Sequence, residues 1–92
     1  MSNETFESFK LRKLGEGFDQ VLIRDWAPDF FNEPHVHPFD TEALVVDGEF
    51  WLSMNGQTSH FKKGDLFRVD RDVIHHERYG PDGAIFWAAR KN

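Results

Sequence analysis

The sequence contains no cysteine, which excludes disulfide bonds and thiolate metal sites and is compatible with a reducing cytoplasm. It also lacks any apolar run near the roughly 20 residues that a membrane-spanning helix needs. The opening residues, MSNETFESFK, have no signal-peptide pattern. Basic residues are fewer than acidic ones, 11 against 16, and the net charge is −5. We therefore expect a cytoplasmic protein that binds neither nucleic acid nor membranes.

Aromatic residues, in contrast, are plentiful: they make up 15% of the 92 residues, with ten Phe and three Trp. This ring content suits one small domain whose barrel or sandwich interior is filled by large side chains. Because so short a chain buries a modest share of its surface, we expect a metal ion or a partner subunit to add stability. Rings alternate onto both strand faces at Phe50-Trp51 and Phe86-Trp87, and a homodimer would cover the outer face.

Short apolar runs separated by turn signals predict an all-β chain, because no stretch of 10–12 residues shows convincing helical periodicity. Residues 1–10 are expected to form a loose arm or an edge strand. Residues 29–40 contain two prolines, which predicts a loop or an irregular strand at a sheet edge. The expected strands lie within 21–28, 42–56, 57–65, 66–69, 73–80 and 84–91, with turns at Asp47-Gly48, Asn55-Gly56, Lys63-Gly64-Asp65 and 80–83.

The stretch PHVHPFDTE, residues 34–42, contains two histidines two positions apart, His35 and His37. On a strand this spacing places both rings on one face, because side chains alternate between faces, and both rings can then bind one ion. Imidazole and carboxylate ligands suit Mn, Fe, Co, Ni and Zn. Two histidines this close are also common as ordinary surface residues, so the spacing alone leaves both interpretations open.

A second stretch, GDLFRVDRDVIHHERY (64–79), resembles the second sequence motif of the cupin superfamily, G-x5-P-x-G-x2-H-x3-N. PHVHPFDTEALVVDG (34–48) resembles the first motif, in which H-x-H is followed by Glu and later by Gly. The 15 residues between Gly48 and Gly64 match the spacing of small microbial cupins. The resemblance implies a single domain over residues 1–92, folded as a small antiparallel jelly-roll (double-stranded β-helix) barrel.

The same resemblance implies a homodimer and a divalent transition metal (Fe, Mn, Ni or Zn) held inside the barrel. The implied ligands are His35 and His37 with Glu42 from the first motif, and His75 from the second. An octahedral ion with four protein ligands keeps two positions open for a small oxygen-rich molecule, for water or for dioxygen.

The motifs also depart from the cupin pattern. Asp70 and Asp72 replace the Pro and Gly of the second motif, and Asp tolerates turn conformations better than most residues. Tyr79 replaces the final Asn, so the family assigns it no role. Five residues instead of six separate Glu42 from the glycine that ends the first motif. Counting back from that glycine places Thr41 at the ligand position, but a carboxylate binds the ion far better than a hydroxyl, and Glu42 is preferred.

Glu77 and Tyr79 share the face of His75 by alternation and are the candidate catalytic residues. Glu77 could act as general acid or base, could hydrogen-bond a ligand histidine, or could form a salt bridge near the barrel mouth. Tyr79 could cap the pocket or be an ordinary aromatic residue of its rim. His76 is expected on the opposite face, away from the ion.

Three functions fit these features. The first is a metal-dependent dioxygenase, isomerase or lyase that acts on a small oxygen-rich molecule, as many cupins do. The second is a binding or sensing module for such a molecule. The third is a purely structural metal that ties strands together in a small domain. The substrate is not predicted, because one barrel hosts many chemistries.

Overall fold

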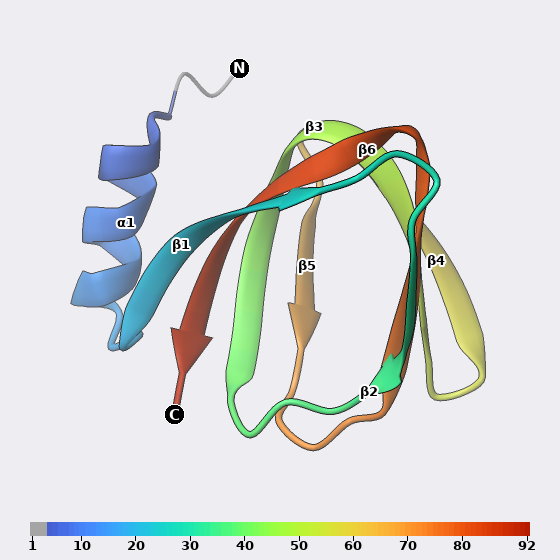
Figure 1. The fold of residues 1–92 in the computed structure, drawn as a ribbon. Helices are drawn as coiled ribbons and strands as arrows, with labels where there is room; N and C mark the ends of the chain where they lie inside the picture. Colours follow the sequence, from blue (N-terminus) through green and yellow to red (C-terminus); the bar gives the residue numbers. More distant parts are fainter. Residues whose placement is uncertain (1–3) are drawn as a thin grey trace.

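The computed structural model describes residues 4–92, which form a helix and six β-strands (Figure 1). The elements are α1 (Phe6–Gly15), β1 (Gln20–Trp26), β2 (Phe31–His35), β3 (Asp40–Met54), β4 (Gln57–Lys62), β5 (Leu66–Val69) and β6 (His75–Lys91). All strand pairs are antiparallel in the order β1–β6–β3–β4, with β2 beside β6 and β5 beside β3. The sheet curls into a small jelly-roll barrel, which confirms the predicted all-β fold class.

The long strands β3 and β6 bend together and so contribute to both halves of the barrel. β6 pairs first with β2 and the end of β3, then with β1 and the start of β3. The turns predicted at Asp47-Gly48 and 80–83 are wrong, because the chain passes through both places as strand, with register shifts in β3. A Cβ on Gly48 would collide with the carbonyl oxygen of Gly83. These turn-type residues make a barrel corner instead of reversing the chain.

Two other local predictions are confirmed. Asn55 and Gly56 join β3 to β4 with positive φ angles of 54° and 73°, as a tight hairpin requires. Strand β2 contains Pro34 and pairs only with β6 among the described strands, so it lies at an edge, where a residue without an N–H is tolerated.

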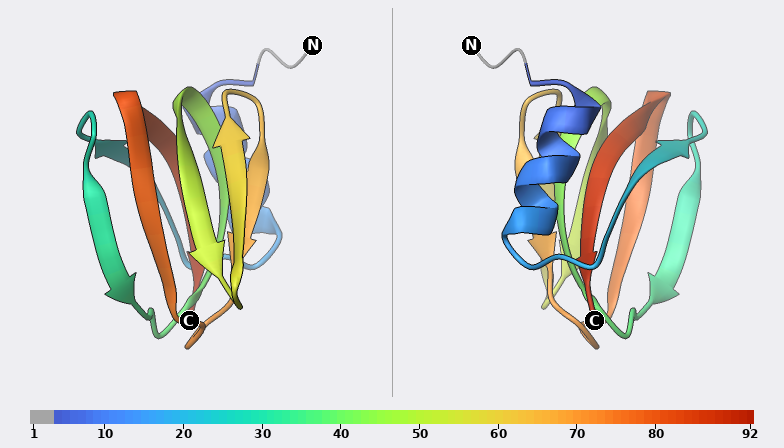
Figure 2. Two further views of the ribbon diagram at one scale, coloured as in Figure 1. Left: turned by 90° about the vertical axis from the view of Figure 1, so that its right-hand side faces the viewer. Right: turned by 90° about the vertical axis from the view of Figure 1, so that its left-hand side faces the viewer.

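The expectation of a loose arm or edge strand at the start of the chain is wrong from Phe6 onward, where α1 begins. Residues 1–3 lie outside the described part. Thr5 caps the helix by accepting a hydrogen bond from the Ser8 N–H at 3.1 Å. Phe9 is fully buried against the outside of the barrel, and Figure 2 shows the helix lying on the barrel wall. The helix is short and weakly amphipathic, so packing of its few apolar residues stabilises it more than its own periodicity.

Apolar side chains therefore form two clusters, one inside the barrel and one between the helix and the wall. The interior includes Tyr79, which is only 2% exposed and stacks on Trp26 and Phe50. Tyr79 is thus a core residue, and the interpretation of it as a rim aromatic is wrong.

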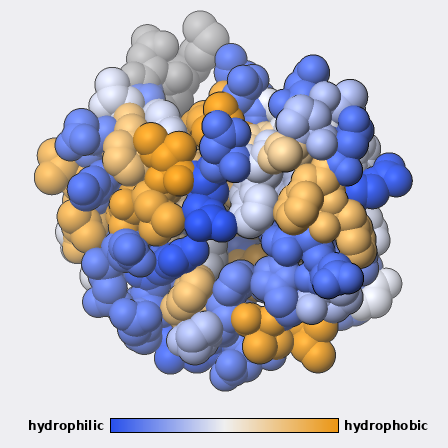
Figure 3. Space-filling view, viewed as in Figure 1, coloured by the Kyte–Doolittle hydropathy of each residue, from blue (hydrophilic) through white to orange (hydrophobic). Residues whose placement is uncertain are grey.

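Several large apolar side chains remain exposed in the described chain, among them Leu11, Leu66 and Ile74. Figure 3 shows hydrophobic patches between hydrophilic side chains on one face of the molecule. The homodimer stays a prediction, because these patches do not identify what covers them. Among residues 4–92, no helix has the length and apolar character needed to cross a membrane.

Candidate metal centre

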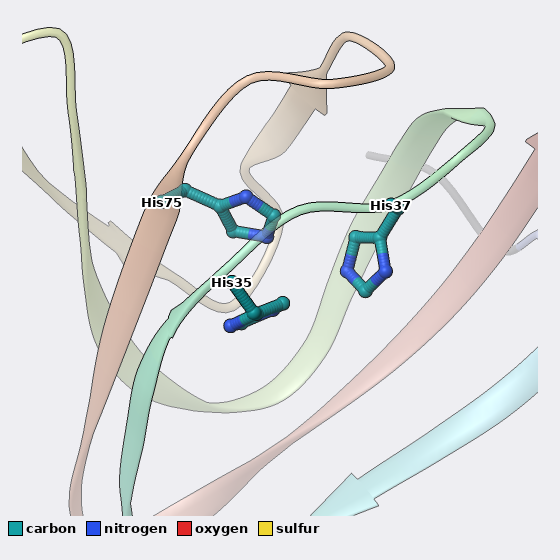
Figure 4. Close-up of side chains that lie close together, drawn as sticks. All are labelled: His35, His37 and His75. Atoms are coloured by element: carbon teal, nitrogen blue, oxygen red, sulfur yellow. The ribbon is translucent and has the colours of Figure 1, made fainter.

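Three histidines converge at one end of the barrel: His35, His37 and His75 (Figure 4). One ligand nitrogen from each ring lies within 4.8 Å of the other two. The ring centroids of His35 and His75 are 4.2 Å apart, and His37 lies 4.8 Å and 5.0 Å from them. The structure thus brings together both histidines of the first motif and the histidine of the second, from positions up to 40 residues apart in the sequence.

Strand pairing positions the rings of His35 and His75, and a backbone hydrogen bond positions the loop that carries His37. His35 ends β2 and pairs directly with His75, the first residue of β6. His37 follows in the loop to β3, and its carbonyl oxygen accepts a hydrogen bond from the backbone N–H of Asp72 at 2.9 Å. Asp72 has a φ of 63°, a left-handed conformation that suits the glycine of the cupin motif. The second motif therefore holds the first in place through its turn, and Asp at position 72 preserves that turn.

Hydrogen bonds fix which ring nitrogens face the cluster. Nδ1 of His75 lies 2.9 Å from the carbonyl oxygen of Val73, and Nδ1 of His35 contacts the carbonyl oxygen of Glu33. A carbonyl oxygen only accepts, so each Nδ1 carries the proton. In the neutral ring Nε2 then has a free lone pair, which is the arrangement of a metal-binding histidine.

The electrostatic setting of His37 favours its neutral ring. Burial, followed by the nearby charges of His75 and His35, lowers the pKa of His37 to about 4. The ring of His37 therefore stays neutral near pH 7 and keeps a lone pair for an ion. Three imidazoles in one place are a donor set that suits a borderline transition metal.

Glu42, the carboxylate predicted as the fourth ligand, lies elsewhere. Its Oε1 accepts a hydrogen bond from Lys13 Nζ at 2.8 Å and its Oε2 accepts one from Arg68 Nη1 at 2.7 Å. Lys13 belongs to α1 and Arg68 to β5, so the Glu42 carboxylate lies on the outer side of the barrel wall, facing the helix. Thr41, one residue earlier, lines the cavity beside the histidines. The structure therefore places the alternative residue, Thr41, on the inner face and does not bring Glu42 to the cluster.

Glu77 is the carboxylate of the described chain that lies next to the histidines. It is 7% exposed, and its Oε2 is 3.7 Å from Nε2 of His35. Asn32 Nδ2 donates a hydrogen bond to Oε2 at 3.3 Å, and the Tyr79 hydroxyl donates one to Oε1 at 3.3 Å. Burial raises the pKa of Glu77 above its usual range, against the lowering effect of His75 and His35. Of the two catalytic candidates, Glu77 lines the cavity and Tyr79 lies behind it.

The cavity also contains two residues that the sequence did not single out, Arg24 of β1 and Arg90 of β6. Their inward direction depends on the pairing of β1 with β6, in which Arg24 faces Phe86 of the core. In the sequence, Arg24 stands two residues before Trp26 and Arg90 two residues after Ala88, so each arginine shares a strand face with an apolar residue. This spacing does not tell which of the two faces points into the barrel.

The chain matches the AraC-like ligand binding domain family over residues 17–89. It is 32% identical over 78 residues to germin-like protein subfamily 2 member 1 of Arabidopsis thaliana, an alignment that covers 78% of this chain and 34% of the relative. The chain thus spans about a third of the length of this curated relative.

Solved structures share the fold. An uncharacterized conserved protein with a double-stranded β-helix domain from Klebsiella pneumoniae is 27% identical, with a TM-score of 0.66 over 77% of this chain and 64% of that one. A chain from the crystal structures of the DMSP lyases RdDddP and RnDddQII gives a TM-score of 0.72 at 16% identity, over 78% of this chain and 37% of that one. The second likeness concerns the fold alone.

Proposed function

The chain belongs to the AraC-like ligand binding domain family, within the cupin superfamily, and from this premise we propose that it is a metal-dependent enzyme for a small oxygen-rich molecule. His35, His37 and His75 would hold a divalent transition metal such as Fe, Mn, Ni or Zn. The observation that carries the proposal is that the three rings lie within reach of one ion, while the Nδ1–H groups of His35 and His75 are tied to backbone carbonyls and leave the Nε2 lone pairs of these two rings free for a metal.

Three protein ligands leave positions open, which is typical of catalytic and not of structural metal sites. A metal bound there would act as Lewis acid, as template or, for Fe and Mn, as redox centre. The buried setting of Glu77 and its raised pKa suit a residue that takes up or gives a proton beside the ion. Tyr79 and Asn32 would position the Glu77 carboxylate through the hydrogen bonds they donate to it.

A non-catalytic binding module is the second candidate, because the matching family is described as ligand-binding. The lyase activity of structural neighbours favours an enzyme only weakly, since the likeness to them is limited to the fold. The two candidates differ in the role of Glu77. In a binding module Glu77 would only contact the ligand, whereas in an enzyme it would be needed for turnover.

The first experiment measures metal. The protein is purified without chelator, its transition-metal content is determined, and its thermal unfolding is followed with added Fe, Mn, Ni or Zn. We expect bound metal and a raised Tm with at least one of these ions. Less than about a tenth of an equivalent, with no gain in Tm for any ion, would contradict the metal centre.

The second experiment separates enzyme from binding module. The metal-loaded protein is screened with a panel of small hydroxy, oxo and carboxylic acids for turnover and, in the Fe(II) form, for dioxygen uptake. Glu77→Gln is the matched variant, and we expect it to retain metal while losing turnover. Ligand binding by the wild type without turnover of any compound in the panel would favour the binding module.

A further inference from the structure

The cavity beside the histidines contains two guanidinium groups, those of Arg24 and Arg90, and neither is in ion-pair contact with a carboxylate of the described residues, Glu77 of the same cavity included. Among residues 4–92, neither Arg24 nor Arg90 forms an ion pair. Other arginines of this acidic protein do so: Arg68 pairs with Glu42 and Asp70, and Arg71 with Asp40. The two arginines that line the cavity are therefore charged donors without a carboxylate partner in the described part of the chain.

Each guanidinium lies over an aromatic ring. The Cζ of Arg24 is 4.7 Å from the ring centroid of Trp26, and the Cζ of Arg90 is 4.6 Å from that of Phe39. Stacking uses the face of the guanidinium and leaves its N–H groups free along the edge. The rings thus hold both side chains in place with their hydrogen-bond donors available.

The two positive charges also act on each other. Burial, and then the charge of Arg24, lowers the pKa of Arg90. Like charges gathered in a partly buried cavity destabilise the fold unless an anion offsets them.

A third donor in the same cavity has no partner. The indole Nε1 of Trp26 is buried, and no described residue accepts a hydrogen bond from it. Trp26 lines the cavity together with both arginines. A buried N–H without an acceptor costs free energy, and a ligand oxygen that reached this N–H would recover it.

We propose that Arg24, Arg90 and Trp26 form a binding site for the carboxylate of a small organic acid, next to the three histidines. The fork of a guanidinium fits the two oxygens of a carboxylate, and the indole N–H supplies a further donor. This inference rests on the proposed function for the role of the acid as substrate or ligand, but the carboxylate site itself needs no metal.

The cavity limits the size of the acid. Its volume is about 70 Å³, which corresponds to roughly five water-sized positions. An acid of two or three carbon atoms fits this space, whereas a sugar acid would need the barrel mouth to widen.

The test uses glycolate as the probe and its neutral amide, glycolamide, as the matched control. Metal-free protein is prepared with a chelator that is then removed, because common chelators are themselves carboxylates. Binding is followed by the indole N–H signals in a ¹H–¹⁵N NMR spectrum, where Trp26→Phe identifies the Trp26 signal. We expect glycolate to shift this signal and to bind at least about tenfold more tightly than glycolamide.

Variants locate the site. Arg24→Gln and Arg90→Gln should each weaken glycolate binding about tenfold or more. Arg78→Gln is the control, because its guanidinium lies over Trp51 on the outer face, and it should change nothing. Arg24→Lys keeps the charge and should restore part of the affinity, which also covers the case that Arg24→Gln does not fold.

Three results would overturn the proposal: equal binding of glycolate and glycolamide, glycolate binding that survives both Gln variants, or tighter binding of inorganic phosphate at the same arginines. Because glycolate binding is measured on metal-free protein, a negative result contradicts the carboxylate site and leaves the proposed metal centre untouched. A protein that binds metal but not glycolate would retain the proposed function and lose only the carboxylate site.

Discussion

Two neighbouring residues of β3, Thr41 and Glu42, point into different environments. Thr41 faces the cavity with the three histidines, and Glu42 faces the underside of α1. On the outer side the charges are matched, since the Glu42 carboxylate is shared by Lys13 and Arg68. On the inner side the cavity residues Arg24, Arg90 and Trp26 carry hydrogen-bond donors that lack an acceptor among the described residues. The outer set is a closed network of ion pairs, whereas on the inner side Arg24 and Arg90 have no carboxylate partner among residues 4–92, which is why we propose a ligand there.

The difference between Thr41 and Glu42 shows that the alternation of side chains along β3 determines which residue can reach the cavity. A shift of one residue in β3 exchanges the inner and outer faces. Either residue could stand at the ligand position by sequence, and the pairing of β3 with β5 and β6 decides which of them faces inward. The carboxylate that resembles a cupin ligand serves the fold here, and the cluster is left with three histidines and the nearby Glu77.

The largest expected effect is a loss of stability from a substitution on the outer side, between α1 and the barrel wall. Phe9→Ala removes a fully buried ring between α1 and the barrel wall, and we expect it to lower the free energy of unfolding by about 3 kcal/mol or more. Leu11→Ala on the same helix is the control, because Leu11 is 70% exposed and should cost less than about 0.5 kcal/mol. Chemical denaturation measures both. Equal losses would mean that the helix is not docked through Phe9.

The next effect belongs to the inner region. His75→Ala removes one of the three imidazoles proposed to bind the metal. Loss of a residue that merely hydrogen-bonds to a metal ligand lowers metal affinity by about 10- to 100-fold, so we expect the loss of the ligand itself to lower it at least about 100-fold. Glu42→Gln, one face away, should leave the affinity within about twofold of the wild type. Titration with a competing chelator gives both values. A comparable loss in Glu42→Gln would show that this carboxylate reaches the ion and would remove the contrast between the two faces.

Much of this arrangement follows from the sequence, and the reasons for the rest are specific. His35, His37 and His75 are found because motif spacing survives in a barrel with fixed strand pairing. The helix at Phe6 goes unnoticed because a short helix that packs by few residues has weak periodicity, although its Thr5 cap and Gly17 stop were readable signals.

The remaining differences between the predictions and the structure arise from the alternation of strand faces and from pairing between strands that are distant in the sequence. Local turn residues such as Gly48 do not reveal that two strands bend at a shared corner, because that requires knowledge of the partner strand. For the same reason the sequence does not tell whether Thr41 or Glu42 faces inward, nor that Arg24 and Arg90 meet inside the barrel.

A smaller effect tests the outer network by pH. Hydrogen bonding to Lys13, and the charge of Arg68, lower the pKa of Glu42 below its ordinary value of 4.5. Stability from this group is therefore fully present above that value and is lost as the pH falls through the lower, folded-state pKa. Glu42→Gln should cost roughly 1–2 kcal/mol near pH 7, because Lys13 is buried and loses a partner, and the difference from the wild type should shrink near pH 3. Denaturant unfolding at both pH values measures it, and a difference that does not change with pH would rule out the charge as its cause.

The last prediction moves the carboxylate from one face to the other. Thr41→Glu combined with Glu42→Gln places an acid at the inner position, where Thr41 lines the cavity beside the histidines. A carboxylate added to three imidazoles should raise metal affinity by about tenfold, because a negative oxygen donor attracts the cation and Thr does not. Thr41→Gln with Glu42→Gln is the matched control, with the same length of side chain and no charge at position 41. If the acid and the amide bind metal equally, position 41 does not reach the ion, and the inner face of β3 contributes only the wall of the cavity.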